Sequence, residues 1–237
     1  MNVTLFGAKA EELRPLFEAQ SSLDLVEDGA DVIVCFGGDG TLLAAELKWP
    51  GVPKVPIRNS RRGIRCISDP PDQVIQRLAK NDLIRTEHLK IHCTVNHLDP
   101  DSPVNKLLAI NEFNVHMGHT NASVRFRVWF DGKPYGTDDH EIIGDGFVVC
   151  SPFGSTAYFN QITRGVFWSG IGVAFKYTAD HTNHLIVPED TVVRALITRG
   201  PAVLAYDNSS EYIELVEGDE LTIRKHEQPA ILLTTDA

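Results

Sequence analysis

The residues best suited to chemistry lie in the loop Gly37-Gly38-Asp39-Gly40-Thr41. Glycines let the backbone turn sharply and let a ligand approach the main chain, and the N–H groups that start a following helix favour an anion. A carboxylate such as Asp39 fits there if it binds a phosphate-bound cation or takes a proton from a hydroxyl that attacks phosphorus. The loop therefore indicates phosphoryl transfer to an alcohol. A glycine-rich turn in which Asp39 caps the helix is the structural alternative.

A second candidate segment is arginine-rich. Four arginines fall between Arg58 and Arg65 in an otherwise acidic chain. The guanidinium fork matches phosphate oxygens two at a time. Because the segment follows a strand predicted at 54–57, in the same sheet as the glycine loop, we expect Arg61 and Arg62 to bind donor phosphates. A solvated loop with outward charges is the alternative.

The pair Asn111-Glu112 interrupts an apolar, strand-like run from residue 106 to 115. A polar pair inside such a strand costs stability unless each group is hydrogen-bonded. The pair could hold a sugar hydroxyl or a base edge. Alternatively, it ends the strand at a surface.

A fourth constellation begins with Asp145-Gly146 and runs to Tyr158. A strand predicted at 147–151 leads into a Pro/Gly turn and a helix start. There Ser155 and Thr156 would present hydroxyl and N–H groups. The alternative is a capped helix after a buried strand.

The elements that position these residues change character along the chain. In residues 1–85, strands alternate with helices, which predicts an α/β domain with an open, Rossmann-like sheet and the glycine loop at its strand carboxyl ends. In residues 86–237, short alternating runs separated by turns predict a β-rich domain. Strands are expected at 2–6, 23–26, 32–36, 54–57, 89–95, 124–130, 191–198, 202–206, 212–216, 221–224 and 230–233, and helices at 8–20 and 73–80.

Composition narrows the class of protein. The 237 residues carry a net charge of -10, which argues against nucleic acid or an anionic membrane as the main partner. No run approaches the ~20 apolar residues of a membrane helix, and the N-terminus lacks the features of a signal peptide. Four scattered cysteines suit reduced thiols in a cytoplasmic protein. The nine histidines show no recognised zinc spacing, so we predict no metal held by the protein alone.

Taken in this order, the pieces resemble the NAD kinase family. The resemblance rests on Gly37 to Thr41, on Asn111-Glu112, and on Asp145-Gly146 followed by the Gly-Ser-Thr-Ala-Tyr element at 154–158. Diacylglycerol and sphingosine kinases share the first element, whereas the last is much more specific. The resemblance implies an α/β domain, a β-rich domain of stacked sheets, NAD bound between them, and a homodimer or homotetramer.

The resemblance also implies a reaction and residue roles. The terminal phosphate of ATP, or of polyphosphate, would pass with Mg²⁺ to the 2′-hydroxyl of the adenosine ribose of NAD. Asp39 would be the general base or orienter of that hydroxyl, and the donor phosphates would be lined by Gly37, Gly38, Gly40 and Thr41. Asn111 and Glu112 would contact the adenosine part of NAD, and Thr156 and Ala157 would lie by the adenine. Asp145 and Tyr158 would contact the other end of NAD from the neighbouring subunit, and Asp207 would be a further NAD contact.

Two stretches depart from the family pattern. Arg65 stands where the family has a glycine, and Cys66 stands where it has an aromatic residue that helps to hold adenine. The stretch 159–165 also differs from the usual Ser-x-Ser-Ala-Gly-Gly-Pro. Because the stretch that contacts adenine is altered, a catalytically weak or inactive NAD- or nucleotide-binding protein on the same fold is the alternative function. A lipid kinase of the sister families, which share the first glycine element, is a less favoured alternative.

Overall fold

The computed structural model describes residues 1–97, 107–179 and 182–236. It divides into two compact units, the first made of Met1–His88 with Gln228–Ala237 and the second of Leu89–Glu227. The sequence predicts a division at 85/86 with all later residues in the second domain, whereas Gln228–Ala237 lie in the first unit. Strand β19 (Ala230–Thr234) pairs with β4 (Lys54–Arg58) and β5 (Ile84–His88), so the chain ends in the first unit.

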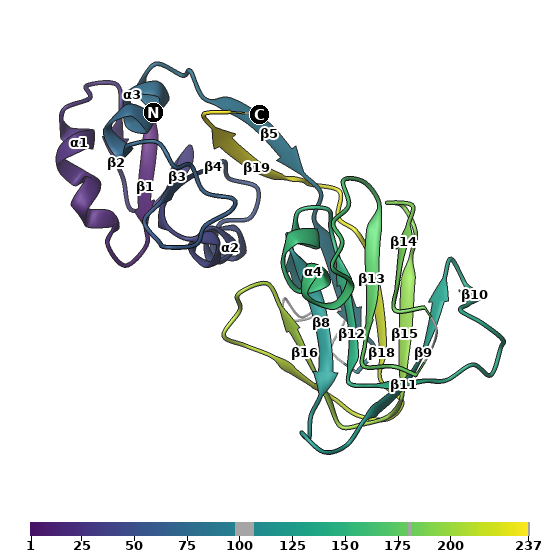
Figure 1. Ribbon diagram of the computed structural model, residues 1–237. Coiled ribbons are helices and arrows are strands. Elements are labelled where there is room, and N and C mark those ends of the chain that lie inside the picture. The colour runs from purple at the N-terminus through teal and green to yellow at the C-terminus, as the bar shows by residue number, and fades with distance from the viewer. Residues whose placement is uncertain (98–106, 180–181, 237) are drawn as a thin grey trace. The chain divides into compact units, whose positions relative to one another are not determined.

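The first unit is built on a six-stranded sheet in the order β2-β1-β3-β4-β19-β5 (Figure 1). All neighbouring strands in it are parallel except β19 and β5. Its other elements are β1 (Asn2–Phe6), β2 (Asp24–Leu25), β3 (Val32–Gly37), α1 (Arg14–Glu18), α2 (Asp39–Lys48) and α3 (Pro71–Ala79). This is the α/β domain that the sequence predicts.

The apolar patterns explain these elements. Val32 to Phe36 is buried throughout, as expected for a central parallel strand. The apolar face predicted for residues 8–20 is confirmed at Leu13 and Phe17, which are buried. The helix itself is shorter than predicted, because a 3₁₀ turn precedes α1 and Pro15 lies in its first turn. Proline has no backbone N–H to continue a helix from the preceding turn.

The second unit stacks two antiparallel sheets around one core. One has the order β10-β9-β15-β18-β6-β7, with β11 also on β9, and the other the order β14-β13-β12-β8-β16-β17. Their strands are β6 (Ile91–Val95), β7 (Leu107–Ala109), β8 (Glu112–Met117), β9 (Val124–Phe130), β10 (Lys133–Pro134), β11 (Ile142–Gly144), β12 (Gly146–Cys150), β13 (Ile171–Lys176), β14 (His184–Val187), β15 (Val193–Arg199), β16 (Ala202–Tyr206), β17 (Ile213–Leu215) and β18 (Glu220–Lys225). Inward residues of both sheets form the largest buried cluster.

A short helix covers the outer face of the second sheet. In α4 (Tyr158–Thr163), Phe159 packs with Phe167 over Val148, Cys150 and Ala174 of β12 and β13. The β-rich unit of stacked sheets is therefore confirmed together with the α/β unit, and the helix places Tyr158 at the edge of this outer face.

One predicted strand is two strands. The run from 106 to 115 breaks at Ile110-Asn111, where the chain passes from β7 in one sheet to β8 in the other. Residues 98–106 lie outside the described part, so the start of the predicted run is not placed. An apolar run alone does not show such a change of sheet, because both halves face the same core.

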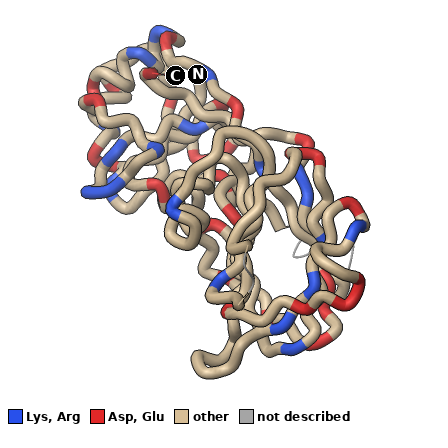
Figure 2. The backbone as a smooth tube through the Cα atoms, turned by 45° about the vertical axis from the view of Figure 1, so that its right-hand side comes forward, with Lys and Arg blue, Asp and Glu red and all other residues tan. Residues whose placement is uncertain are grey.

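Acidic and basic residues are interspersed along both units, as Figure 2 shows. Many are paired on the surface, for example Arg14 with Glu11 and Lys225 with Glu189. In the described residues, no helix is long and apolar enough to cross a membrane.

Candidate functional site

The glycine loop lies where the sequence places it, between the end of β3 and the start of α2. Gly38 is the N-cap residue, in an extended conformation, and Asp39 is the first residue of the helix. A Cβ atom on Gly37 would lie 2.2 Å from Thr41 Oγ1, and one on Gly38 would lie 2.9 Å from Ser60 Oγ. A side chain at Gly37 would therefore displace Thr41, and one at Gly38 would displace the Ser60 hydroxyl. The two glycines leave the backbone at the start of α2 uncovered by side chains of their own.

The Asp39 carboxylate is bonded to the arginine segment. Its Oδ2 accepts the N–H of Ile64 at 3.0 Å, and its Oδ1 accepts the N–H of Arg65 at 3.0 Å and the thiol of Cys66 at 3.5 Å. The alternative in which Asp39 caps its own helix is wrong, because α2 has no side-chain cap. A carboxylate has about four lone-pair sites, so Asp39 can still accept a hydroxyl.

Cys66 meets Asp39 as a neutral thiol. Burial, with a smaller contribution from the Asp39 charge, raises the pKa of Cys66 to about 12. The thiol therefore keeps its proton at neutral pH and donates a hydrogen bond to the Asp39 carboxylate. The sequence resemblance predicts an adenine contact at this position, and the structure shows instead a hydrogen bond from Cys66 to Asp39.

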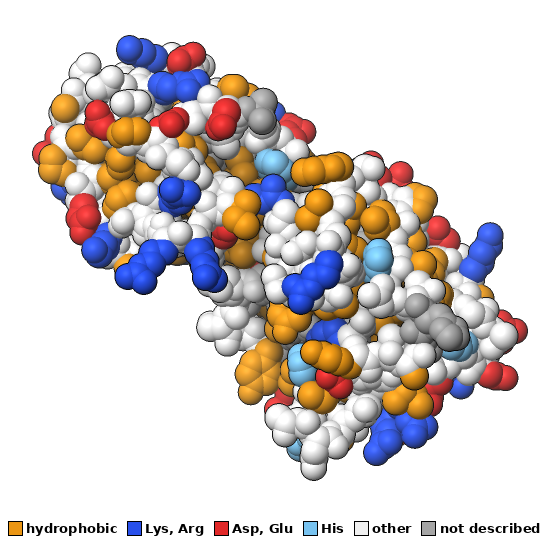
Figure 3. All heavy atoms as spheres, viewed as in Figure 1, with side chains coloured by type: hydrophobic (Ala, Val, Ile, Leu, Met, Phe, Trp, Pro, Cys, Tyr) orange, Lys and Arg blue, Asp and Glu red, His pale blue; other side chains and the backbone are white. Residues whose placement is uncertain are grey.

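The arginine segment lies directly beside the glycine loop. Gly37 is opposite Arg58 in the sheet, and the N–H of Asn59 donates to Gly37 O at 2.7 Å. Arg58, Arg61 and Arg62 are exposed. In Figure 3 several basic side chains project from the lower side of this unit. The structure thus brings together the predicted donor-phosphate residues, Gly37 to Thr41 with Arg61 and Arg62, while their role stays a prediction.

In the second unit, Asn111 and Glu112 lie at the crossing between sheets, and Asp207 holds that crossing. Asp207 Oδ2 accepts the N–H of Ile110 at 2.8 Å, and its Oδ1 accepts those of Asn111 at 2.8 Å and Glu112 at 3.2 Å. Asp207 follows β16 with a left-handed φ of 42°. The carboxylate replaces the ladder hydrogen bonds that the chain gives up when it changes sheets.

The Glu112 side chain has the properties of a ligand-binding group. It is buried, and among the described residues its Oε2 has no hydrogen-bond partner. Burial raises the pKa of Glu112 to about 8, and the nearby Asp207 charge adds to the shift. Buried polar atoms without partners are uncommon in folded proteins and call for an explanation. At neutral pH the protonated carboxyl group can donate a hydrogen bond as well as accept one.

Hydrogen bonds join the turn after β12 to the same crossing. The Ser151 hydroxyl donates to Ile110 O, and the N–H of Gly154 donates to Ser151 Oγ at 3.2 Å. The N–H of Ser151 donates to Asn111 O at 2.9 Å. A Cβ on Gly154 would lie 2.2 Å from Asn111 O, so only glycine fits. The two motifs that are distant in sequence therefore form one rigid feature.

Residues 155–157, which follow this turn, differ in their exposure to solvent. The expectation that Ser155 offers its hydroxyl to a ligand is wrong, because that hydroxyl is buried and donates to Pro152 O at 2.7 Å and Phe167 O at 3.1 Å. Thr156 and Ala157 are partly exposed just before α4. They remain candidates for a ligand contact.

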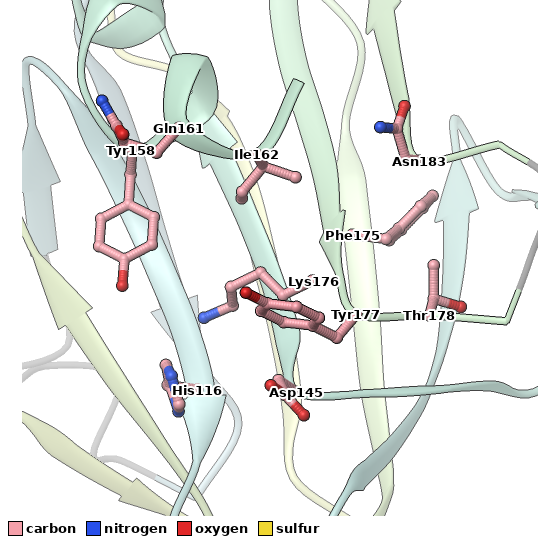
Figure 4. Close-up of a pocket in the computed structure, with 10 residues that line it drawn as sticks. All are labelled: His116, Asp145, Tyr158, Gln161, Ile162, Phe175, Lys176, Tyr177, Thr178 and Asn183. Atoms are coloured by element: carbon pink, nitrogen blue, oxygen red, sulfur yellow. The ribbon is translucent and has the colours of Figure 1, made fainter. Parts of the chain in front are cut away.

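A cavity of about 690 Å³ opens beside α4 in the second unit (Figure 4). Asp145 and Tyr158, both predicted site residues, lie in its wall. Its lining residues are His116, Asp145, Tyr158, Gln161, Ile162, Phe175, Lys176, Tyr177, Thr178 and Asn183.

Lys176 is the most deeply buried charged residue among the lining residues that sequence reasoning missed. Its side chain is 4% exposed, and its Nζ donates to Asn114 Oδ1 at 2.7 Å. Burial lowers the pKa of Lys176 to about 7, and the Asp145 charge opposes that shift. The available signal was a lysine at the end of the apolar stretch 165–175, where a strand would bury it.

Comparison with known proteins shows relatives along most of the chain. The NAD kinase of Acidithiobacillus ferrooxidans is 25% identical over 91% of this chain and 79% of the relative. That of Thermoplasma acidophilum is 26% identical over 92% and 79%, and that of Magnetococcus marinus 24% identical over 96% and 76%. No family model matches.

Two solved structures share the fold. Yeast NADH kinase complexed with NADH has a TM-score of 0.83 at 15% identity, with 100% of this chain and 84% of that chain covered. An NAD kinase from Archaeoglobus fulgidus in complex with ATP has a TM-score of 0.78 at 19% identity, with 98% and 93% covered. The likeness supports the predicted fold class.

Proposed function

We propose that this chain is an NAD kinase, like its relatives along most of its length, and that it transfers a phosphoryl group from ATP or polyphosphate to the 2′-hydroxyl of the adenosine ribose of NAD, giving NADP. The observation that carries the proposal is the buried Glu112 carboxyl, whose Oε2 has no partner among the described residues. A ribose hydroxyl supplies the donor and acceptor that this oxygen needs.

The acceptor nucleotide is held by the second unit in this proposal. Glu112 and Asn111 bind the adenosine, and Thr156 and Ala157 lie by the adenine. Asp207 acts on the nucleotide through the backbone of 110–112, whose three N–H groups it binds. Asp145 and Tyr158 bind the other end of NAD, which fits their place in the 690 Å³ cavity.

Asp39 activates the ribose hydroxyl. A carboxylate within hydrogen-bond reach takes the proton as the oxygen attacks phosphorus, which contributes about 10²–10⁴ in rate for general bases. The hydrogen bonds from Ile64, Arg65 and Cys66 fix the carboxylate in one orientation. Such positioning is a major part of phosphoryl-transfer catalysis.

The donor phosphates bind at the glycine loop. Backbone N–H groups at the start of α2 and the exposed guanidinium groups of Arg61 and Arg62 stabilise their negative charge. Among the described residues, no three His, Cys, Asp or Glu side chains gather into a metal-binding group. We propose that a divalent metal such as Mg²⁺ enters with the donor and neutralises phosphate charge there.

A coupled assay tests the function. Purified protein is incubated with Mg²⁺, NAD and either ATP or polyphosphate, and NADP is detected with an NADP-specific dehydrogenase. Product above the no-enzyme control supports the proposal and identifies the better donor. No product from folded protein that binds NAD would favour a nucleotide-binding protein without turnover.

We also propose that the chain is a homodimer or homotetramer. Val166, Trp168, Tyr177 and Ile186 of the second unit expose large apolar surfaces, with Trp168 at 82% and Tyr177 at 91%. Large apolar side chains exposed on a surface are a common component of protein–protein interfaces. Light scattering coupled to size exclusion measures the mass; a monomer at micromolar concentration would contradict this proposal.

A further inference from the structure

Lys176 reaches across one strand to the next. In the outer sheet of the second unit, Gly146 on β12 is paired with Lys176 on β13 and with His116 on β8. Glycine leaves no side chain between the two neighbours, so the lysine can extend over β12. Its Nζ reaches Asn114 on β8 at 2.7 Å.

The amine lies against the cavity wall and not in solvent. Its Nζ is 5.7 Å from the centre of the Tyr158 ring, and in Figure 4 the side chain extends toward Tyr158 and His116. The other titratable groups that line the cavity are Asp145, which precedes β12, and Tyr177, which follows β13. Lys176 therefore places an amine, charged below a pKa of about 7, in a largely buried wall, with Asp145 as the nearby carboxylate.

On the basis of the proposed function, which places the nicotinamide end of the substrate by Asp145 and Tyr158, we propose that Lys176 determines which oxidation state of the dinucleotide the chain accepts. The nicotinamide ring of NAD is a cation, and the dihydronicotinamide ring of NADH is uncharged. An ammonium group in the cavity wall repels the first and not the second. The site therefore favours NADH over NAD.

The expected discrimination is large enough to measure. Two like charges about 6 Å apart at an effective dielectric constant of about 20 repel strongly enough for a preference of roughly a hundredfold. The Asp145 carboxylate shares the cavity and offsets part of this repulsion, so we expect a preference of about tenfold.

The preference depends on pH because the lysine titrates. The pKa of Lys176 is lowered to about 7 by burial. Below that pH the amine is charged and NAD is disfavoured. Above it the amine is neutral, the repulsion disappears, and NAD binding strengthens toward that of NADH.

Direct binding measurements test this inference separately from turnover. NADH binding is followed by its fluorescence and NAD binding by calorimetry, at pH 6 and pH 8.5, for the wild type and Lys176→Met. Methionine keeps the length of the side chain and removes its charge. Lys133→Met is the matched control, because Lys133 is exposed on β10. Melting temperatures establish that each variant is folded, and Lys176→Gln replaces Lys176→Met if the latter is not.

The expected result is a Kd ratio of NAD to NADH of about ten for the wild type at pH 6, falling toward one at pH 8.5. Lys176→Met should show a ratio near one at both values, and Lys133→Met should behave as the wild type. An equal ratio in the wild type and Lys176→Met at pH 6 would overturn the role of Lys176. If both nucleotides bind with the expected ratio but no NADP or NADPH forms, the kinase proposal fails and the charge selection stands. Binding of neither nucleotide would overturn both.

Discussion

Both units use an aspartate to hold a loop, but the two loops have different surroundings. Asp39 accepts the N–H groups of Ile64 and Arg65, and Asp207 accepts the three successive N–H groups of residues 110–112. A carboxylate that accepts backbone N–H groups forms charge-assisted bonds stronger than those of neutral groups. The same interaction thus fixes the candidate donor loop in one unit and the candidate acceptor loop in the other.

What differs is how far the rest of the structure supports each loop. The crossing at 110–112 is also bonded to Ser151 and leaves no room for a side chain at Gly154. The segment that Asp39 binds carries exposed Arg61 and Arg62. Each carboxylate accepts three hydrogen bonds, so the two differ in what surrounds the loop they bind. The proposed function gives Asp39 the catalytic role and leaves Asp207 mainly a structural one.

The largest effect should come from Asp39→Asn. Loss of the general base should lower kcat by about 10²–10⁴, while the amide oxygen still accepts one backbone N–H and the fold persists. Turnover in the coupled assay and the melting temperature measure the two effects. Full activity in a folded variant would refute the assignment of the base.

Asp207→Ala should lower stability more than Asp39→Asn does, and turnover less. Removal of an acceptor from three N–H groups should lower the free energy of unfolding by about 2–4 kcal/mol. Urea unfolding of this variant beside Asp39→Asn sharpens the comparison directly. Equal loss of stability in the two variants would mean that the loops do not differ in the way proposed.

Glu112 predicts a pH dependence of stability. Its pKa rises from an ordinary 4.5 to about 8 on folding, so the folded state holds a proton that the unfolded state releases. The stabilising contribution is full below pH 4.5 and is lost as the pH rises to about 8. Glu112→Gln should remove this part of the dependence of the unfolding free energy on pH. Urea unfolding at pH 5 and pH 8 measures that dependence. If the variant shows the same pH dependence of stability as the wild type, a group other than Glu112 is responsible for it.

The smallest effect is expected from the arginines. Arg61→Ala combined with Arg62→Ala should raise the donor KM about three- to tenfold, since exposed charge contacts are weak, with little change in kcat. The double variant Arg14→Ala with Arg85→Ala is the matched control, because both residues are exposed in the same unit. An unchanged donor KM would mean that the arginine segment is a solvated loop that does not bind the donor.

The local pattern of the sequence was sufficient for much of the fold. Strands predicted at 2–6, 124–130 and 202–206 match the structure to the residue. These segments alternate or are wholly apolar, and a period of two or a buried run depends only on neighbouring residues. The motifs could be assigned for the same reason, because glycines and polar residues at fixed spacing form local turns.

Only the tertiary structure decided how distant residues meet. The sequence does not show that the chain changes sheets at Ile110-Asn111, that β19 returns to the first unit, or that Asp207 binds the crossing. Lys176 is the clearest case. Its lowered pKa arises from burial between strands that lie 30 and 62 residues earlier in the chain, opposite Gly146 and bonded to Asn114. Desolvation depends on what surrounds a group in space, and no local pattern records that.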